Sequence, residues 1–150
     1  MRIRVINGPN INMLGIREPD VYGRTTYNDL EDMIKDHAQK NEIQVEVMQS
    51  NHEGDLVDMI QDCYKKVDGI VINPGAYTHT SIAILDALKA VSVPAVEVHI
   101  SNVDEREDFR QISYIRKACV RTISGHGVNG YLEAVDILKN YVEDAHGMDK

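Results

Sequence analysis

The chain has 150 residues and a formal net charge of −8, which argues against a nucleic-acid partner, because such partners are bound by basic surfaces. The hydrophobic fraction of 43% and the charged fraction of 27% are typical of a soluble globular protein, and we expect residues 1–150 to form one domain. No apolar run approaches the roughly 20 residues that cross a bilayer, and Met1 leads directly into a strand pattern instead of a signal peptide. We therefore expect a cytoplasmic protein without a membrane partner, in which Cys63 and Cys119 are reduced, buried thiols.

Five apolar runs rich in β-branched residues predict strands, and most of them are continuous, which is typical of strands covered on both faces. The predicted strands are Ile3–Ile6, Ile43–Met48, Gly69–Asn73, Ala95–Ile100 and Cys119–Ile123. Helical stripes fill the gaps, at Tyr27, Leu30, Ile34 and Ala38; at Leu56, Ile60 and Cys63; at Ala83, Leu85 and Leu88; and at Tyr131, Val135, Leu138 and Val142. Thr26, with Asp29 three residues later, predicts a capping box at the start of the first of these helices.

Strands that alternate with helices predict an open, mostly parallel α/β sheet. At this length we expect a flavodoxin-like fold, with five strands in the order 2-1-3-4-5 and helices on both faces. Ligands of such sheets bind beyond the carboxyl ends of the strands, at the point where the strand order reverses, here between strands 1 and 3. The segments Asn7–Gly23, Asn73–Ser81 and His99–Arg110 are therefore predicted to share one crevice.

A long connection between the first strand and the first helix, Ile6–Gly23, shows neither a helical nor a strand period. Connections of this length are uncommon in compact domains unless they are disordered or functional, and this one is too apolar for disorder. It carries Arg17 and Tyr22 between hinge-like glycine and proline residues. We predict that it forms a lid over a site.

Polar residues follow the third predicted strand. Asn73 and His79 are candidates for hydrogen bonds to a ligand at the start of the next helix, where free N–H groups suit an oxygen-rich molecule. The alternative is that His79 is a surface loop residue and that Thr78, Thr80 or Ser81 simply caps the helix.

The fourth predicted strand carries two polar residues on one face, because Glu97 and His99 are two positions apart. Burying a carboxylate and an imidazole is costly unless they pair, and a paired histidine is suited to general acid or base chemistry. A structural hydrogen bond at a strand end is the alternative, but the position at the carboxyl end of a central strand favours function.

Arg106 and Arg110 follow, one helical turn apart if the segment is helical. A solvated helix face with ion pairs between neighbouring turns is one interpretation. The other is that Arg110, beside the predicted crevice, binds substrate oxygens.

Residues 125–130 read G-x-G-x-x-G between a strand and a helix, but no further strand with an acidic residue follows, as the dinucleotide fingerprint requires. We interpret this stretch as a tight turn and expect no nicotinamide cofactor. The sequence contains no P-loop, no G-x-S-x-G motif and no convincing metal-ligand spacing. What remains is proton-transfer chemistry without a cofactor, carried by Tyr22, His99 and arginines.

The blocks G-P-N-I-N-M-L-G-I-R-E-P-D-V-Y-G, N-P-G-A-Y-T-H-T-S, V-E-V-H-I-S-N and R-E-D-F-R-Q-I-S-Y resemble the signature blocks of type II 3-dehydroquinate dehydratases. They occur in order, at the expected spacing, across nearly the whole chain. The resemblance implies a flavodoxin-like fold and the reversible anti dehydration of 3-dehydroquinate to 3-dehydroshikimate through an enolate, without a cofactor. It also implies trimers that assemble into a dodecamer. The reaction serves both aromatic biosynthesis, through the shikimate pathway, and quinate breakdown.

The resemblance also implies roles for particular residues. Tyr22 is the base that removes the C2 proton, and Arg17 favours its phenolate, since a free tyrosine titrates near ~10. His99, oriented by Glu97, protonates the departing C1 hydroxyl, and Asn10 helps to hold a water against the enolate oxygen. The implied substrate contacts are Asn73, His79, Ile100, Ser101 and Arg110, with Asp86 reaching the site from a neighbouring subunit.

One position departs from the family pattern. Family members commonly carry an arginine directly before the aspartate that corresponds to Asp86, where the present chain has Leu85. We expect the change to alter how Asp86 is held or how subunits pack, without abolishing the chemistry.

The alternative from another class is a non-catalytic flavodoxin-like module that binds a phosphorylated ligand or receives a phosphoryl group. A receiver would need acidic residues after the first strand and an aspartate at the end of the third, where this chain has Asn7 and Asn73. A flavin-binding module would need aromatic residues around the ring, and the chain has no tryptophan. The sequence therefore favours the enzyme.

Overall fold

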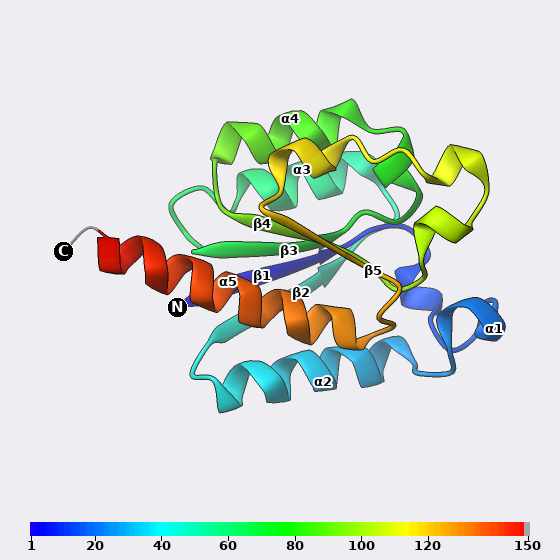
Figure 1. Ribbon diagram of the computed structural model, residues 1–150, viewed down its shortest axis with the longest axis horizontal. Coiled ribbons are helices and arrows are strands. Elements are labelled where there is room, and N and C mark those ends of the chain that lie inside the picture. The colour runs from blue at the N-terminus through cyan, green and yellow to red at the C-terminus, as the bar shows by residue number, and fades with distance from the viewer. Residues whose placement is uncertain (149–150) are drawn as a thin grey trace.

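Five parallel strands form a central sheet in the computed structural model, which describes residues 1–148 apart from the side chains of Tyr22 and Met148 (Figure 1). The strands are β1 (Arg2–Asn7), β2 (Gln44–Gln49), β3 (Gly69–Asn73), β4 (Ala95–His99) and β5 (Arg121–Ser124). They pair in the order β2-β1-β3-β4-β5, each parallel to its neighbours. The predicted flavodoxin-like sheet is confirmed.

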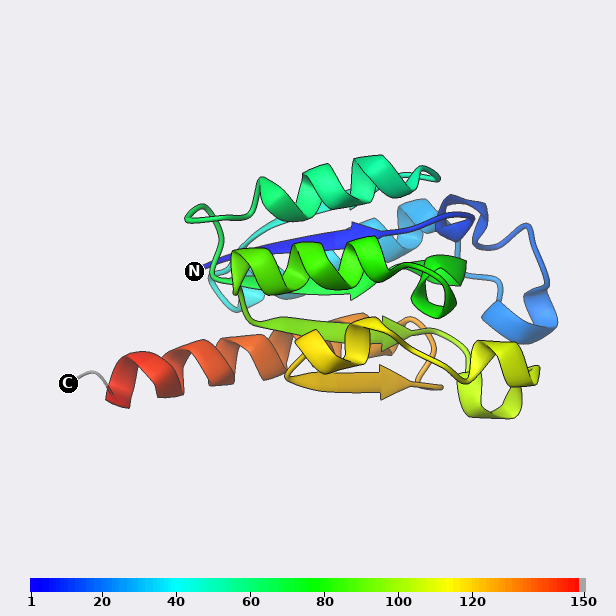
Figure 2. The ribbon, with the colours of Figure 1, turned by 90° about the horizontal axis from the view of Figure 1, so that it is seen from above.

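Helices cover both faces of this sheet (Figures 1 and 2). The helices α2 (Tyr27–Lys40) and α5 (Asn129–Met148) lie on one face, and α3 (Glu53–Gln61) and α4 (Ile82–Val91) lie on the other. The chain runs from β1 outward to β2 and then back across β1 to β3. Because parallel crossovers are right-handed, this reversal puts α2 and α3 on opposite faces and leaves a switch point at the carboxyl ends of β1 and β3.

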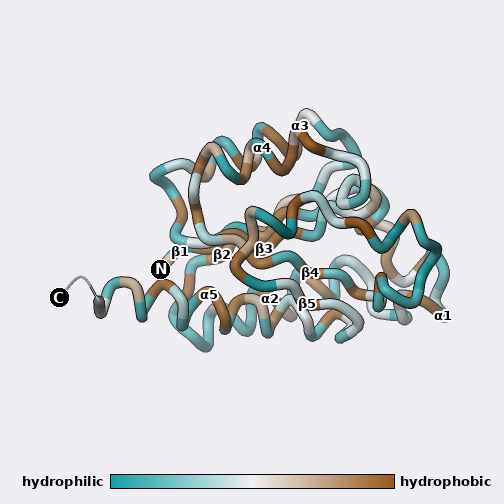
Figure 3. The backbone as a smooth tube through the Cα atoms, turned by 45° about the horizontal axis from the view of Figure 1, so that its top comes forward, coloured by the Kyte–Doolittle hydropathy of each residue, from teal (hydrophilic) through white to brown (hydrophobic). Residues whose placement is uncertain are grey.

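Apolar side chains fill the space on each side of the sheet. Leu30 and Leu138 belong to the cluster under α2 and α5, and Ile60 and Leu88 belong to the cluster under α3 and α4. Successive strand residues point to opposite faces, so a strand covered on both faces is apolar at nearly every position. This explains the continuous apolar runs of the sequence, which Figure 3 shows along the strands, with apolar positions at intervals along the helices.

The helix α2 begins with the predicted capping box. The Thr26 hydroxyl accepts a hydrogen bond from the Asp29 N–H (3.1 Å), and the Asp29 carboxylate accepts one from the Thr26 N–H (3.1 Å). We expect Thr26→Ala to lower the free energy of unfolding by about 1 kcal/mol, because an N–H of the first turn loses its acceptor. Urea unfolding measures this change. Thr26→Ser keeps the hydroxyl and should match the parent protein; an equal loss in both variants would contradict the capping role.

The carboxyl end of α2 explains why β2 begins later than predicted. Ile43 was expected in the strand, but its N–H donates to the Ala38 carbonyl (2.9 Å) while Glu42 adopts a left-handed conformation (φ 58°). This is a helix-closing motif in which an apolar residue follows the left-handed position. The buried Ile43 side chain therefore belongs to the end of the helix.

Two further expectations were wrong. Cys119 precedes β5, because its N–H donates to the Arg116 carbonyl (3.2 Å) at the end of a 3-10 helix, η5 (Ile115–Ala118), and its side chain is half-buried instead of buried. In α4, Ala83 is exposed and the buried positions include Ile84. Ser81 caps that helix and sets a register in which Ile84 faces the sheet.

The connection between β1 and α2 is not irregular throughout. It contains a 3-10 turn, η1 (Ile11–Met13), and a four-residue helix, α1 (Pro19–Tyr22). Elements this short carry no full period in the sequence, so the pattern could not reveal them. In Figure 2, α1 lies beyond the carboxyl edge of the sheet. That position suits a lid, which stays a prediction.

Candidate active site

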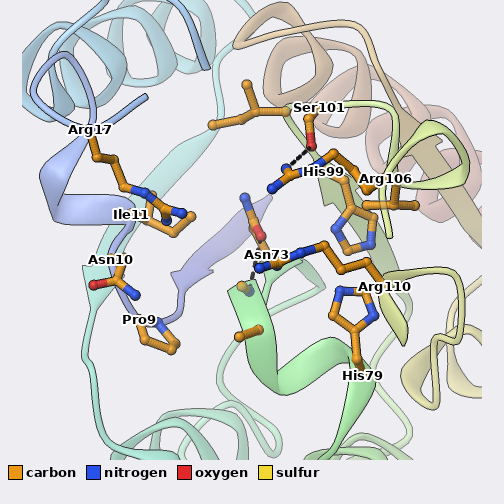
Figure 4. A pocket seen from close by; sticks show the side chains of 14 residues that line it. Pro9, Asn10, Ile11, Arg17, Asn73, His79, His99, Ser101, Arg106 and Arg110 are labelled. Atoms are coloured by element: carbon orange, nitrogen blue, oxygen red, sulfur yellow. Dashed lines mark hydrogen bonds between the residues drawn. The ribbon is translucent and has the colours of Figure 1, made fainter. Parts of the chain in front are cut away.

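A pocket lies beyond the carboxyl ends of β1, β3 and β4, and the three predicted segments all contribute to it (Figure 4). It is lined by Pro9, Asn10, Ile11, Arg17, Asn73, Gly75, Ala76, His79, His99, Ile100, Ser101, Val103, Arg106 and Arg110. The shared crevice that the strand order predicted is therefore present. Eight of the residues singled out from the sequence line it: Asn10, Arg17, Asn73, His79, His99, Ile100, Ser101 and Arg110.

Close backbone contact joins the loops after β1 and β3. The Gly8 N–H donates to the Asn73 carbonyl (2.8 Å), and a Cβ atom on Gly8 would lie 2.2 Å from the Pro74 carbonyl oxygen. Only a residue without a Cβ fits there without moving the backbone. Beyond this contact, Asn10 lines the pocket, and its N–H is held by the side-chain oxygen of Asn51 (3.1 Å).

His99 and Glu97 form the predicted pair at the end of β4. Glu97 is fully buried, and its carboxylate bonds to Nε2 of His99, which leaves Nδ1 as the ring nitrogen without a bond to Glu97. The Ser113 hydroxyl (2.9 Å) and the Thr122 hydroxyl (3.2 Å) donate to the same carboxylate. The imidazole is thus fixed by an anchor that is itself held on several sides.

Burial raises the pKa of Glu97, but the hydrogen bonds from His99 and Ser113 and the charge of Arg116 outweigh it, so the net pKa lies below the ordinary value. Nε of Arg116 lies 3.6 Å from the carboxylate. Glu97 is therefore ionised at neutral pH and accepts hydrogen bonds only. A carboxylate in that state orients the histidine and fixes which of its nitrogens faces Glu97.

Three arginines line the pocket, although the whole chain is acidic. Arg17 comes from the β1–α2 connection and pairs with Glu18 (3.0 Å), while Arg110 pairs with Glu107 (2.7 Å). In Figure 4 Arg17 lies on one side of the pocket and Arg106 and Arg110 lie on the other. Guanidinium groups gathered in this way suit a small, oxygen-rich anion.

Arg106 was not among the site residues chosen from the sequence. Its Nη1 donates to the Ser101 hydroxyl (3.2 Å), and it lies between two 3-10 turns, η3 (Val103–Glu105) and η4 (Asp108–Arg110), instead of on the continuous helix that the spacing suggested. Its spacing of four residues from Arg110 was a signal in the sequence. Because charge runs are more often solvated surfaces, this spacing alone does not assign Arg106 to the site.

His79 also lines the pocket, so it is not simply a surface loop residue. Nδ1 of its ring lies 2.6 Å from the Ile112 carbonyl and donates to it, which leaves Nε2 as an acceptor. Burial is the main cause that lowers the pKa of His79 below its ordinary value. Ser81, not Thr78 or Thr80, caps α4, with its hydroxyl 3.0 Å from the Ile84 nitrogen.

Three predicted site residues, Glu97, Asp86 and Tyr22, are not among those that line the pocket, and Glu97 reaches it only through its bond to His99. Asp86 is exposed on α4. Tyr22 ends α1, and its side chain lies outside the described part of the structure. Asp20 and Val21, which directly precede Tyr22, line a second hollow. This hollow shares Ile100, Ser101 and Arg106 with the pocket. The backbone of the predicted lid therefore borders the same edge of the sheet.

The glycine-rich stretch after β5 is a tight turn, as interpreted from the sequence. The Gly125 N–H lies close to the carbonyls of His99 (3.3 Å) and Ser101 (3.2 Å), and the Gly127 N–H donates to the Ile100 carbonyl (3.1 Å). The turn thus supports the backbone of the pocket wall. Across residues 1–148, no group of three His, Cys, Asp or Glu side chains is placed to hold a metal ion. No helix of the same range is long and apolar enough to cross a membrane.

Enzymes of doubly wound α/β folds bind small substrates at this edge of the sheet. The chain has this fold and a pocket at this edge of the sheet, lined in part by three arginines, as an enzyme of that class would.

Comparison with known proteins narrows the class. The family model described as dehydroquinase class II matches residues 1–139. A 3-dehydroquinate dehydratase of Clostridium acetobutylicum is 57% identical over 140 residues, which cover 93% of this chain and 97% of the relative. The crystal structure of the type II dehydroquinase of Butyrivibrio crossotus superposes with a TM-score of 0.91 at 54% identity, over 93% of this chain and 97% of that one. The type II dehydroquinase structure from Propionibacterium acnes gives a TM-score of 0.88 at 39% identity, covering 95% and 96%. The chain belongs to the class II dehydroquinase family.

Proposed function

We propose that the protein converts 3-dehydroquinate reversibly to 3-dehydroshikimate by an anti elimination that needs no cofactor. The observation that carries the proposal is the pocket of Figure 4, in which Arg17 of the β1–α2 connection lies opposite a histidine anchored by a buried carboxylate. Relatives that carry this activity in their names span almost the whole chain. The family assignment also favours an enzyme over the non-catalytic module.

The elimination removes a proton from C2 and the hydroxyl from C1. In the proposed mechanism the Tyr22 phenolate takes the C2 proton, and the electrons of that C–H bond form an enolate with the C3 carbonyl. Arg17 favours the phenolate by its charge, and Asn10 helps to hold a water against the enolate oxygen. The enolate then collapses, the C1–O bond breaks, and His99 donates the proton with which the hydroxyl leaves as water. Proton exchange with solvent restores both residues.

Recognition of the substrate would use the remaining polar groups of the pocket. The Ile100 and Ser101 backbone and the Ser101 hydroxyl would bind the carboxylate, and Asn73, His79 and Arg110 the ring oxygens. Support comes from their shared position in one cavity. The arginines give that cavity the positive charge that a carboxylate substrate needs.

Assembly into trimers and then a dodecamer is part of the proposal. Asp86 is exposed and does not line the pocket of its own chain, which fits a residue that serves a neighbouring subunit. Leu85 beside it is buried in the α3–α4 cluster, so it holds the helix instead of pairing with the aspartate. A cytoplasmic location and a place in the shikimate pathway complete the proposal.

Purified protein should convert 3-dehydroquinate to an ultraviolet-absorbing enone-carboxylate with no added cofactor. Ultraviolet absorbance measures the rate directly. Dialysis against a chelator should leave that rate unchanged, because no step uses a metal. Borohydride added with substrate should leave it unchanged as well, because no imine forms. Loss of activity in borohydride would point to a lysine imine and would overturn the mechanism.

A further inference from the structure

A buried network of hydrogen bonds runs from the pocket into the core behind it. Tyr131, in the first turn of α5, is fully buried, and its hydroxyl donates to Oδ1 of Asn7 (2.7 Å). The same hydroxyl oxygen accepts a hydrogen bond from Nδ2 of Asn73 (2.9 Å). Asn7 and Asn73 are the last residues of β1 and β3 and lie opposite each other in the sheet register. This hydrogen-bond network therefore crosses the switch point directly beneath the site.

Such an arrangement is not explained by core packing alone. A buried hydroxyl and two buried amides each cost free energy unless their hydrogen bonds are made. A phenylalanine ring in place of Tyr131, with apolar residues at the strand ends, would fill the same space without that cost. Of the three residues, Asn73 also lines the pocket, so the hydrogen-bond network ends on a side chain that is placed to touch a ligand.

The direction of every hydrogen bond in this network follows from a single backbone group. The Gly75 N–H can only donate, and it donates to the Asn73 side chain (3.1 Å), so the amide oxygen must face Gly75. The amide nitrogen then faces Tyr131, whose oxygen accepts. The single proton of the Tyr131 hydroxyl must go to Asn7. One N–H of the Asn73 amide is used by neither Gly75 nor Tyr131.

We propose that Tyr131 is a positioning residue that acts through Asn73, holding its amide so that this remaining N–H is presented to an oxygen of the bound substrate. The inference rests on the proposed function, because it concerns the same site. Tyr131 itself lies behind the pocket and does not line it. Burial raises the pKa of Tyr131 far above the ordinary tyrosine value, so its hydroxyl keeps its proton. The directions of these hydrogen bonds therefore do not change with pH.

The variant Tyr131→Phe keeps the ring and removes the hydroxyl, and Tyr141→Phe makes the same change at a half-exposed position of the same helix. We expect KM for 3-dehydroquinate to rise about five- to tenfold in Tyr131→Phe, the size of one hydrogen bond. The kcat should change little, because the amide contact is present in ground and transition states alike. Tyr141→Phe should match the parent protein in both constants.

A double-mutant cycle separates positioning from general stability. If Tyr131 acts through the amide, Tyr131→Phe should raise KM in the parent background but change it less than about twofold in an Asn73→Ala background. Urea unfolding of all four proteins reports the stability cost independently. An equal rise in KM in both backgrounds, or no rise in the parent background, would overturn the positioning role.

Asn7→Ala tests the hydrogen-bond network from the end farther from the pocket, and it replaces Tyr131→Phe if that variant does not fold. Without the Asn7 acceptor, the proton of the Tyr131 hydroxyl loses the partner that fixes its direction, so the hydroxyl oxygen is no longer held as the acceptor for the Asn73 amide. We expect KM to rise several-fold with kcat retained; an unchanged KM would contradict the fixed direction. The parent protein is assayed in parallel, so that absence of any turnover counts against the proposed function and not against the positioning role.

Discussion

Replacement of Tyr22 by phenylalanine is expected to lower kcat by about a thousandfold, within the range that a positioned base contributes. The phenol is the proposed base for the C2 proton, and no other group of the proposed mechanism can take its place. Initial rates of enone formation at saturating 3-dehydroquinate measure the loss. Binding should persist, because the proposed substrate contacts at Asn73, His79 and Arg110 come from other segments.

The matched control for this variant is Tyr64→Phe, the same chemical change on an exposed side chain in the turn that follows the carboxyl end of α3, the end away from the pocket edge. Tyr64→Phe should retain the parent rate, and both variants should show the parent unfolding curve and molecular mass in solution. Near-normal turnover in Tyr22→Phe would mean that the base lies elsewhere in the chain.

Replacement of His99 by alanine is expected to lower kcat by about 10²- to 10⁴-fold, the contribution of a general acid. The C1 hydroxyl would then have to leave without a proton donor. The substrate Kd, measured by calorimetry under conditions of slow turnover, should change much less than kcat. Glu97 keeps hydrogen bonds from Ser113 and Thr122, so the fold should survive the substitution.

His126→Ala provides the comparison, because the His126 side chain is exposed, is not among the residues that line the pocket, and pairs with Glu133 (2.6 Å). That variant should retain the parent kcat. If His99→Ala lost substrate affinity while keeping kcat, the histidine would be a binding residue and the acid would have to be sought elsewhere.

The fold was predictable because each of its determinants is local in the sequence. Apolar runs covered on both faces marked the strands, and their alternation with helical stripes set the parallel order. Two boundaries shifted because backbone groups at Ile43 and Cys119 close the preceding helices, a use of the N–H that an apolar pattern does not record. Of the predicted α4 stripe, Leu85 and Leu88 are buried and only Ala83 is exposed, because a single alanine gives too weak an apolar signal to assign its face.

The site was predictable as far as strand order and two-residue spacing reach. These placed three segments in one crevice and paired Glu97 with His99. They did not reveal the bridge from Tyr131 to strand ends that are 124 and 58 residues away, because a helical stripe identifies a buried tyrosine only as core. The roles of Tyr22 and Asp86 depend on the family resemblance and stay predictions.

The distribution of the pocket along the chain has a consequence for folding. Its walls draw on residues between Pro9 and Arg110, so no short contiguous fragment contains them all. Parallel strands form no contacts with their immediate sequence neighbours until the crossover between them has closed, which makes their assembly slow. Recovery of turnover after dilution from denaturant therefore reports the docking of β1, β3 and β4, and trails the appearance of helical signal.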